Sequence, residues 1–429
     1  MKLTAHSCSH LVRPHGQRIV CSGDRSQYPI STILLLGLVL FVAGCASQPF
    51  TPQSVSSAPY LERGVTQTEG PLRVTAAVPD EGETRDLFGI DLYEQGIQPI
   101  WLEVENTGDH RARLALWSVD PDYFSPIEVA YMNRGDYSKE GKADMERWFY
   151  ENRMGRRVQP GETRSGFVYT HLMQGTKGFN LDIYSNLQGY YFTFFVPIPG
   201  ITADYMEVDF EGLYAEAEVQ VLDEDGLRQA LQDEVCCSTD ETGTRTGDPF
   251  NMVLIGTGVS IRRGLMRAGW HETPAGSPDT AVARTHRYRG RQPDGTFHKT
   301  RPDGSELKEL RLWLTPLQLG EQLVLIGQVS NGLKRTGRET EFVDYRIDPD
   351  LDDARIYLVQ DFWYGQSLAQ VGHVTGAERA PIESPHQNFS GQPYFTDGLR
   401  AVLLLSKDPV AMDDATAFDW EQLVDYRAR

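Results

Sequence analysis

Short runs of alternating apolar and polar residues dominate the first half of the chain. In the stretch IWLEVENTGD, which begins at Ile100, Leu102 and Val104 point to one face of an extended backbone and their neighbours point to the other. Six such runs are rich in β-branched and aromatic residues, which favour strands. They are Leu72 to Val78, Gln98 to Asn106, Ala112 to Val119, Arg164 to Thr170, Gly178 to Tyr184 and Gly189 to Val196. We therefore predict antiparallel sheets, each with one face in water.

Turn-forming residues separate these strands, as at Asn106 to Asp109 and Gln159 to Glu162. One helix is predicted among them, over Lys142 to Met154, because large apolar residues recur there at three- and four-residue spacing. The whole pattern resembles bacterial immunoglobulin-like sandwiches. Residues 71–222 are therefore predicted to form an N-terminal immunoglobulin-like β-sandwich.

Helical and strand patterns are mixed from Asp223 onward. The predicted helices cover Asp223 to Val235, Val259 to Ala268 and Leu351 to Gln366. The predicted strands are Met252 to Ile255, Ala283 to Tyr288, Leu307 to Leu314, Gln322 to Ser330, a run near Val371, and Leu399 to Leu405. This order predicts a mixed α+β domain over residues 223–406, a sheet covered by helices on one side, with a tail at 407–429. The predicted fold class is α+β overall.

An apolar run from Ile30 to Ala43 follows scattered basic residues near the N-terminus and ends at Cys45. A membrane-spanning helix needs about 20 apolar residues, so this run suits a secretory signal better than a permanent span. An uncleaved anchor is the alternative. The last four residues, Val42, Ala43, Gly44 and Cys45, resemble a bacterial lipobox. Residues 1–44 are thus predicted to be a lipoprotein signal peptide, and its long polar start, residues 1–28, indicates that translation begins downstream of Met1.

The lipobox resemblance implies that the protein is a bacterial lipoprotein. It implies cleavage before Cys45, acylation of its thiol, and a membrane partner reached through the lipid. Ala46 follows where an aspartate would imply retention at the inner membrane, so the expected location is the outer membrane, facing the periplasm. Residues 45–70 are rich in Ser, Pro, Gln and Thr and are predicted to be a flexible tether.

The charge of the chain restricts its partners. The formal net charge is −19. Loss of residues 1–44 removes four basic residues and one acidic residue and leaves about −22. Nucleic acid is therefore excluded as a partner, and charge-driven binding to lipid headgroups is disfavoured. The concentrated positive stretch, Arg284 to Arg301 with His271, His286 and His298 nearby, is interpreted either as a solvated loop or as a receiver for an anionic envelope ligand or envelope protein.

Other motifs carry weak chemical signals. Cys236 and Cys237 form either a vicinal disulfide or a pair of buried thiols. The run Gly256 to Gly258 fits a tight turn or a phosphate-binding turn, and the aspartates from Asp348 to Asp353 fit a helix cap better than a calcium loop. No hydrolase, kinase or metalloprotease signature occurs, and no cofactor or metal site is predicted.

Several motifs resemble the LssY C-terminal domain family. They are GDPFNMVLIGTGVSIRRGLMRAGW from Gly247, LKELRLWLTP from Leu307, VLIGQVSNG from Val324, RIDPDLDDARIYLVQDF from Arg346 and YFTDGLRAVLLLS from Tyr394. The resemblance spans about residues 236–405 and implies envelope association, because this domain often accompanies membrane phosphatase-like or DedA-like segments. It assigns no activity. Where relatives carry histidines, this chain has Lys308-Glu309 and Tyr345-Arg346, which puts any chemistry of those imidazoles in doubt.

These features favour an envelope lipoprotein with a binding or scaffolding role at the outer membrane. The alternative is an accessory or catalytic component of envelope lipid hydrolysis or dephosphorylation. A polar site is predicted if five residues converge on one cleft: Asp248, Arg311, Arg346, Asp348 and Asp350. Calcium-dependent binding through the aspartates is a weaker third hypothesis.

Overall fold

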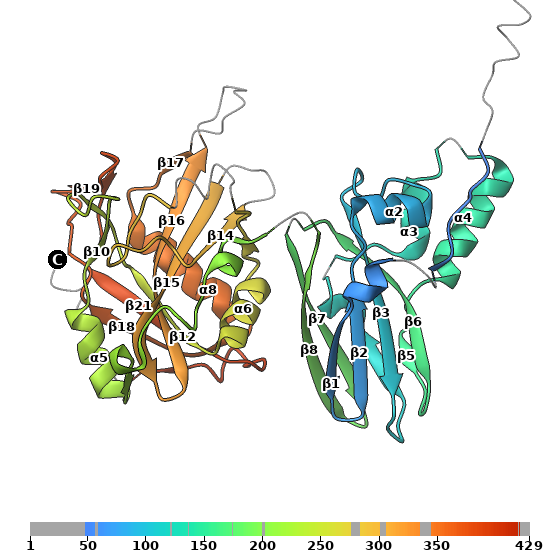
Figure 1. Cartoon of the computed structure of the whole chain (residues 1–429), viewed down its shortest axis with the longest axis horizontal. Helices are drawn as coiled ribbons and strands as arrows, with labels where there is room; N and C mark the ends of the chain where they lie inside the picture. Colours follow the sequence, from blue (N-terminus) through green and yellow to red (C-terminus); the bar gives the residue numbers. More distant parts are fainter. Residues whose placement is uncertain are drawn as a thin grey trace, which may run out of the picture. The chain divides into compact units, whose positions relative to one another are not determined.

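The computed structural model describes residues 48–55, 59–120, 122–135, 137–173, 175–199, 202–275, 284–300, 306–334, 345–418 and 420. The predicted signal peptide and Cys45 lie outside these residues. Within them, no helix combines the length and the apolar character needed to cross a bilayer. The strand-rich N-terminal half and the mixed C-terminal half can be followed in Figure 1.

Two four-stranded antiparallel sheets form the N-terminal half. The first has the order β1-β2-β3-β6 and the second the order β5-β4-β7-β8. Their bounds are β1 Val65–Glu69, β2 Leu72–Ala77, β3 Ile97–Asn106, β4 Ala112–Ala115, β5 Arg157–Val158, β6 Thr163–His171, β7 Thr176–Ser185 and β8 Gln188–Pro197. All six predicted strands are confirmed. The run from Ala112 is shorter than predicted, because a 3-10 turn, Leu116–Ser118, replaces its end.

The two sheets share one hydrophobic core. Leu102 and Val104 of β3, which alternation predicted to share a face, are fully buried there with Leu181 of β7 and Phe194 of β8. Burial at every second position is expected when each sheet turns one face inward. The described fold is therefore a β-rich two-sheet arrangement, and its immunoglobulin-like identity stays a prediction.

Three helices pack beside the first sheet. They are α2 Glu81–Phe88, α3 Pro126–Met132 and α4 Lys139–Glu151. An aromatic cluster joins them to the strands, with Phe88 of α2, Phe149 of α4 and Phe167 of β6 all buried. Helix α4 begins three residues before its predicted start, because the hydroxyl of Ser138 accepts the Gly141 amide and caps the helix.

The described fold begins before the end of the predicted tether. Phe50 is buried and its ring lies 6.4 Å from that of Phe149. A 3-10 helix follows at Pro59–Arg63, and β1 pairs with β2 along its full length. Flexibility through residue 70 is therefore wrong for the described part of that segment. Its serine and proline content gave no indication that Phe50 is packed in the core or that β1 forms an edge strand.

A ten-stranded sheet forms the C-terminal half. Its main order is β13-β14-β15-β16-β12-β21-β18-β22, with β17 beside β16 and β9 beside β15. The bounds are β9 Gln220–Leu222, β12 Met252–Gly256, β13 His271–Glu272, β14 Gly295–Thr300, β15 Glu306–Leu319, β16 Gln322–Lys334, β17 Tyr345–Ile347, β18 Leu368–Thr375, β21 Leu399–Leu405 and β22 Thr416–Ala417. Two small hairpins flank it, β10 Cys237–Thr239 with β11 Thr246–Pro249, and β19 His386–Gln387 with β20 Pro393–Tyr394.

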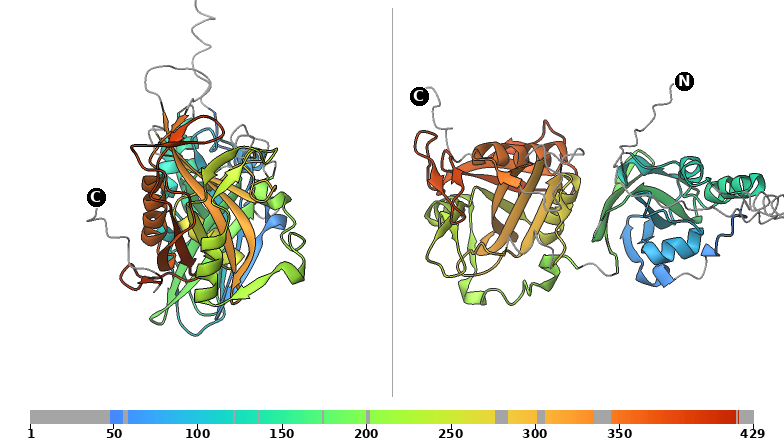
Figure 2. Two further views of the ribbon diagram at one scale, coloured as in Figure 1. Left: turned by 90° about the vertical axis from the view of Figure 1, so that its left-hand side faces the viewer. Right: turned by 90° about the horizontal axis from the view of Figure 1, so that it is seen from above.

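Helices cover both faces of this sheet, which corrects the prediction of one covered face. Helices α6 Gly258–Arg267 and α8 Leu351–Tyr364 share a core with Met252 and Leu254 of β12. Helix α5 Glu224–Asp233 packs with Val253 and Ile255. These two residues alternate with Met252 and Leu254 along β12 and so lie on the opposite face of the sheet. The unbroken apolar run from Met252 to Ile255 is typical of a strand buried on both faces, a signal that the prediction of one covered face did not use. The layers are visible from two directions in Figure 2.

The domain limits also differ from the prediction. Strand β9 at Gln220–Leu222 pairs with β15, so the C-terminal half begins slightly before residue 223. Part of the predicted tail belongs to the fold, because β22 pairs with β18 and Phe418 and Trp420 are buried. The predicted strand at 283–288 is wrong for its described residues, since Arg287 and Tyr288 form only isolated bridges.

Candidate anion-binding site

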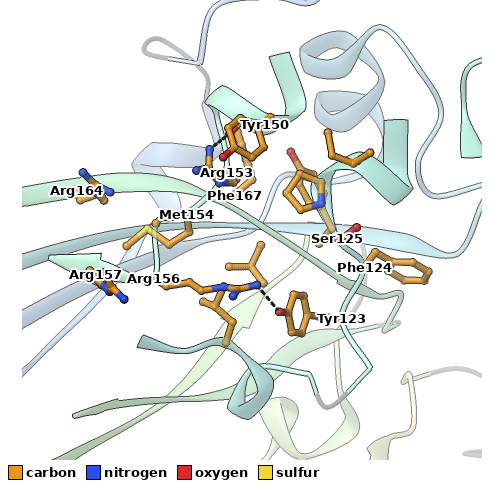
Figure 3. Close-up of a pocket in the computed structure, with 16 residues that line it drawn as sticks. Tyr123, Phe124, Ser125, Tyr150, Arg153, Met154, Arg156, Arg157, Arg164 and Phe167 are labelled. Atoms are coloured by element: carbon orange, nitrogen blue, oxygen red, sulfur yellow. Dashed lines mark hydrogen bonds between the residues drawn. The ribbon is translucent and has the colours of Figure 1, made fainter. Parts of the chain in front are cut away.

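A cavity of about 570 Å³ lies in the N-terminal half. Its walls come from β6, from the start of α3 and from the segment that leads from the end of α4 to β5. Four arginines line it: Arg153, Arg156, Arg157 and Arg164. Figure 3 shows these side chains around the cavity together with Tyr123, Phe124, Tyr150 and Phe167.

A glycine in β6 positions the arginine-bearing segment. Backbone hydrogen bonds join Met154 and Asn152 to Phe167 at 2.8 Å each. A Cβ atom at Gly166 would lie only 2.5 Å from the carbonyl carbon of Arg153, which is shorter than any normal contact. The segment can therefore approach β6 only because residue 166 has no side chain. Gly155 is less constrained, since a Cβ there would meet the flexible side chain of Arg164 and not the backbone.

The positive charge of this cavity is only partly compensated. Arg164 pairs with Glu162 at 3.0 Å. Arg153 lies over the ring of Tyr150, with its guanidinium carbon 3.5 Å from the ring centroid. Arg156 approaches the hydroxyl of Tyr123 at 3.5 Å. In the part of the chain that the structure describes, no carboxylate lies within ion-pair distance of these last two arginines or of Arg157, so the charges of three of the four arginines are not neutralised by a carboxylate, although Arg153 also donates a hydrogen bond to the Tyr150 carbonyl.

The floor and walls of the cavity are otherwise largely apolar. Met154, Phe167 and Val168 are buried, and Ile127 and Tyr150 are about half exposed at its edge. Tyr169 is only 1 % exposed, and its hydroxyl has no hydrogen-bond partner among the described residues. Burial raises the pKa of this tyrosine well above its ordinary value, with a smaller contribution from Tyr60. The buried hydroxyl therefore remains protonated.

This lining suits binding better than acid–base chemistry. The described residues that line it include no histidine, carboxylate, lysine or cysteine. Its serine, Ser125, is already engaged as the cap of α3, where its hydroxyl accepts the amide of Glu128 at 3.2 Å. Guanidinium groups bind phosphate and carboxylate oxygens through paired hydrogen bonds. The arrangement can therefore hold an anionic group whose apolar part contacts the walls.

The five residues of the predicted polar site divide into two places. Asp248 of β11 and Arg311 of β15 come together, with an oxygen and a guanidinium nitrogen 3.6 Å apart. Arg346 lies in β17 and is exposed. Asp348 and Asp350 form the turn before α8, where the Asp350 side chain accepts the amides of the next turn and acts as the helix cap. The aspartates thus serve the backbone, as the capping interpretation predicts.

A buried polar cluster surrounds Asp248. The hydroxyl of Ser238 lies 2.9 Å from Nδ1 of His286, and Gln328 donates to the same hydroxyl at 2.9 Å. Nε2 of His286 is 3.9 Å from an Asp248 oxygen, and Asn388 donates to the other oxygen at 2.8 Å. All five residues are buried. The sequence signal missed here is Gln328, a polar residue within the long apolar strand β16.

Acid should destabilise the protein through this cluster. Burial, with Arg311 nearby, lowers the pKa of His286 from 6.5 to about 2. The unfolded chain binds this proton more tightly than the folded chain does. The contribution of His286 to the free energy of unfolding is therefore fully present above about pH 6.5, and it falls as the pH drops towards 2, by up to about 1.4 kcal/mol per pH unit. Denaturant unfolding between pH 7.5 and 4.5 should show a shallower decline for His286→Gln than for the native chain. Parallel declines would contradict this assignment.

The predicted positive stretch is largely neutralised. Arg284, Arg289 and Arg291 pair with Glu207, Glu234 and Asp294 at 2.9 to 3.0 Å. Lys299 pairs with Asp361 at 2.6 Å. Contrary to the prediction, this stretch is not the only concentration of positive charge in the sequence. Residues 153–164 hold four arginines and one glutamate, a signal visible in the sequence.

Two further motifs have structural roles or partners. The sulfur atoms of Cys236 and Cys237 are bonded to each other, one of the two states left open by the sequence, and a carboxylate oxygen of Glu378 lies 3.9 Å from the Cys236 sulfur. Thr257 caps α6, its hydroxyl accepting the amide of Ser260 at 3.1 Å. The glycines beside Thr257 are thus part of a turn that starts a helix.

Comparison with known proteins supports one domain. Residues 283–399 match the model of the family described as LssY C-terminus, which covers most of the predicted resemblance. The chain is similar to that family over β14 to the start of β21, and Arg311, His286 and Asn388 lie within the match. No curated protein matches the chain. The arginine-lined cavity lies outside the matched residues.

Proposed function

We propose that this chain is an envelope lipoprotein that binds an anionic ligand in the arginine-lined cavity. The observation that carries the proposal is the set of three arginines, Arg153, Arg156 and Arg157, that have no carboxylate partner among the described residues and face an apolar-walled cavity. The predicted acylated Cys45 would hold the protein at the outer membrane, facing the periplasm. The LssY C-terminus-like domain would be a second folded body with a scaffolding role.

The ligand class follows from the lining. A phosphate or carboxylate accepts paired hydrogen bonds from a guanidinium, and each such charged bond contributes roughly 1.5 to 3 kcal/mol. The apolar walls, including Met154 and Phe167, favour a ligand that also carries hydrocarbon or a ring. The acidic remainder of the chain repels anions at long range, so recognition depends on local contacts.

The alternative hydrolase function receives less support. Ser238, His286 and Asp248 have the residue types of a nucleophile, a base and an orienting carboxylate. However, the serine is completely buried, and the ring of Phe389 lies 4.6 Å from that of His286. The Asp248 oxygen is too far from the imidazole for a hydrogen bond. This cluster is better suited to fixing the β10–β11 hairpin on the sheet than to attacking a substrate.

Direct binding tests the proposal. Isothermal titration of the chain from residue 46 with monomeric dihexanoyl phosphatidate should give saturable binding, whereas dihexanoyl phosphatidylcholine should bind far more weakly. Arg156→Gln and Arg157→Gln should each weaken binding about tenfold, because each removes a charged hydrogen bond. Arg111→Gln is the matched control, since Arg111 is exposed and does not line the cavity.

Two outcomes would overturn the proposal. One is the absence of saturable binding by phosphatidate and by free phosphate. The other is equal affinity in the native chain and in the double variant of Arg156 and Arg157. Circular dichroism of each variant checks that the fold is intact. We expect it to be intact, because Arg156 and Arg157 are both exposed.

A further inference from the structure

We infer that the cavity and the exposed face of α3 form a membrane-docking surface, in which the arginines hold the phosphate of an anionic phospholipid. This inference rests on the proposed function, because it assigns the source of the anion. It assigns that source to the bilayer to which the chain is tethered.

Apolar side chains at the cavity edge are exposed to water. Ile127 and Tyr150 line the cavity and are 45 % and 51 % exposed. Tyr131 lies one helical turn after Ile127, on the same side of α3, and is 60 % exposed. A ligand that stayed in solution would leave this rim wet. Insertion into the headgroup region would bury it, which is favourable for tyrosine and isoleucine.

Cations accompany the exposed rings. The guanidinium carbon of Arg134 lies 3.7 Å from the ring centroid of Tyr131, and Arg153 stands in the same relation to Tyr150 at 3.5 Å. Aromatic rings with neighbouring cations suit the boundary between headgroups and hydrocarbon, because the ring enters the apolar layer while the cation meets phosphate. Arg153 also lines the cavity, together with the other three arginines drawn in Figure 3.

The predicted lipid anchor, Cys45, lies a few residues before Phe50, which packs against a helix of this surface. Phe50 packs against Trp148 and Phe149 of α4, at ring distances of 6.1 and 6.4 Å. Tyr150, the next residue of α4, lines the cavity. Cys45 is five positions before Phe50, so the predicted acylated residue can lie no farther than about 18 Å from Phe50. This short connection keeps α4, which contributes Tyr150 to the cavity, near the bilayer.

Local charge explains how an acidic chain can bind an acidic membrane. The net charge of −19 opposes nonspecific adsorption to an anionic membrane. Attraction to anionic lipid must therefore come from the cavity and its rim. Both contributions are needed. Binding should therefore require anionic lipid, the arginines and the exposed apolar residues together, and it should weaken with salt.

Vesicle cosedimentation tests the inference. The chain from residue 46, without its lipid, should bind phosphatidylcholine vesicles that contain phosphatidylglycerol and should not bind phosphatidylcholine alone. The double change Arg156→Gln and Arg157→Gln should weaken vesicle binding by at least about tenfold. Tyr131→Ser should weaken vesicle binding about fivefold while monomeric phosphatidate still binds normally, because Tyr131 lies on the rim and not in the cavity.

Ile382→Ser is the matched control for the rim and should leave vesicle binding unchanged, since Ile382 is similarly exposed, at 62 %, and belongs to the C-terminal half. Retained phosphatidate binding with no preference for anionic vesicles would overturn the inference and leave the proposed function in place. Equal vesicle binding by native chain and Tyr131→Ser would also overturn it. Loss of phosphatidate binding by the native chain would instead remove the proposed function.

Discussion

Replacement of Arg400 by methionine is expected to destabilise the C-terminal half by about 4 kcal/mol or to prevent its folding. Arg400 lies in β21, is fully buried, and donates to five main-chain carbonyls. These carbonyls belong to Leu231, Glu234, Val235, Phe250 and Gly376. Its side chain thus joins the end of α5, the start of β12 and the turn after β18. Methionine has a similarly long side chain but makes none of these five hydrogen bonds.

Thermal and urea unfolding of purified variants measure this effect. Arg400→Lys should be intermediate, because an ammonium has three donors and cannot reach all five carbonyls. Arg379→Met is the control, since Arg379 is exposed, and it should change stability by less than about 0.5 kcal/mol. A midpoint for Arg400→Met close to that of the control would show that the carbonyls find other partners. It would refute the view that this guanidinium organises the domain.

Local patterns predicted the strands well, because alternation and turn residues act within a few positions. The two short helices of the N-terminal half were missed, although their capping boxes can be found in the sequence. Asp80 and Glu83 bond reciprocally at the start of α2, and Ser125 and Glu128 do so at the start of α3. Each helix has at most eight residues, too few for a clear apolar periodicity.

The candidate site was harder to predict than the fold. Its existence depends on the contact of Gly166 with the backbone at Arg153, a pairing of distant residues that no local pattern announces. Average charge also misled, because a value of −19 for the chain conceals four arginines in one segment. Of the five residues of the predicted polar site, Asp248 and Arg311 do lie together, and their pairing fits the cost of burying an unpaired charge.

Replacement of Cys45 by alanine is expected to move the protein almost completely from the membrane fraction to the soluble fraction. Each buried methylene of an acyl chain contributes about 0.8 kcal/mol, so the loss of two or more chains far exceeds anything that the cavity and its rim could restore. Ser31→Ala is the control, because Ser31 lies in the apolar run of the predicted signal segment but outside the lipobox-like residues. Fractionation of cells, followed by mass spectrometry of the mature N-terminus, measures both variants.

The same experiment separates the two interpretations of the apolar run. An acylated Cys45 at the mature N-terminus supports a cleaved lipoprotein signal. It also supports the short connection from the lipid to Phe50, on which the docking surface depends. An intact N-terminus, with the alanine variant still in the membrane, would identify an uncleaved anchor. Residual salt-sensitive membrane binding by the alanine variant, lost when Arg156 and Arg157 are also changed, is the expected contribution of the arginine-lined cavity alone.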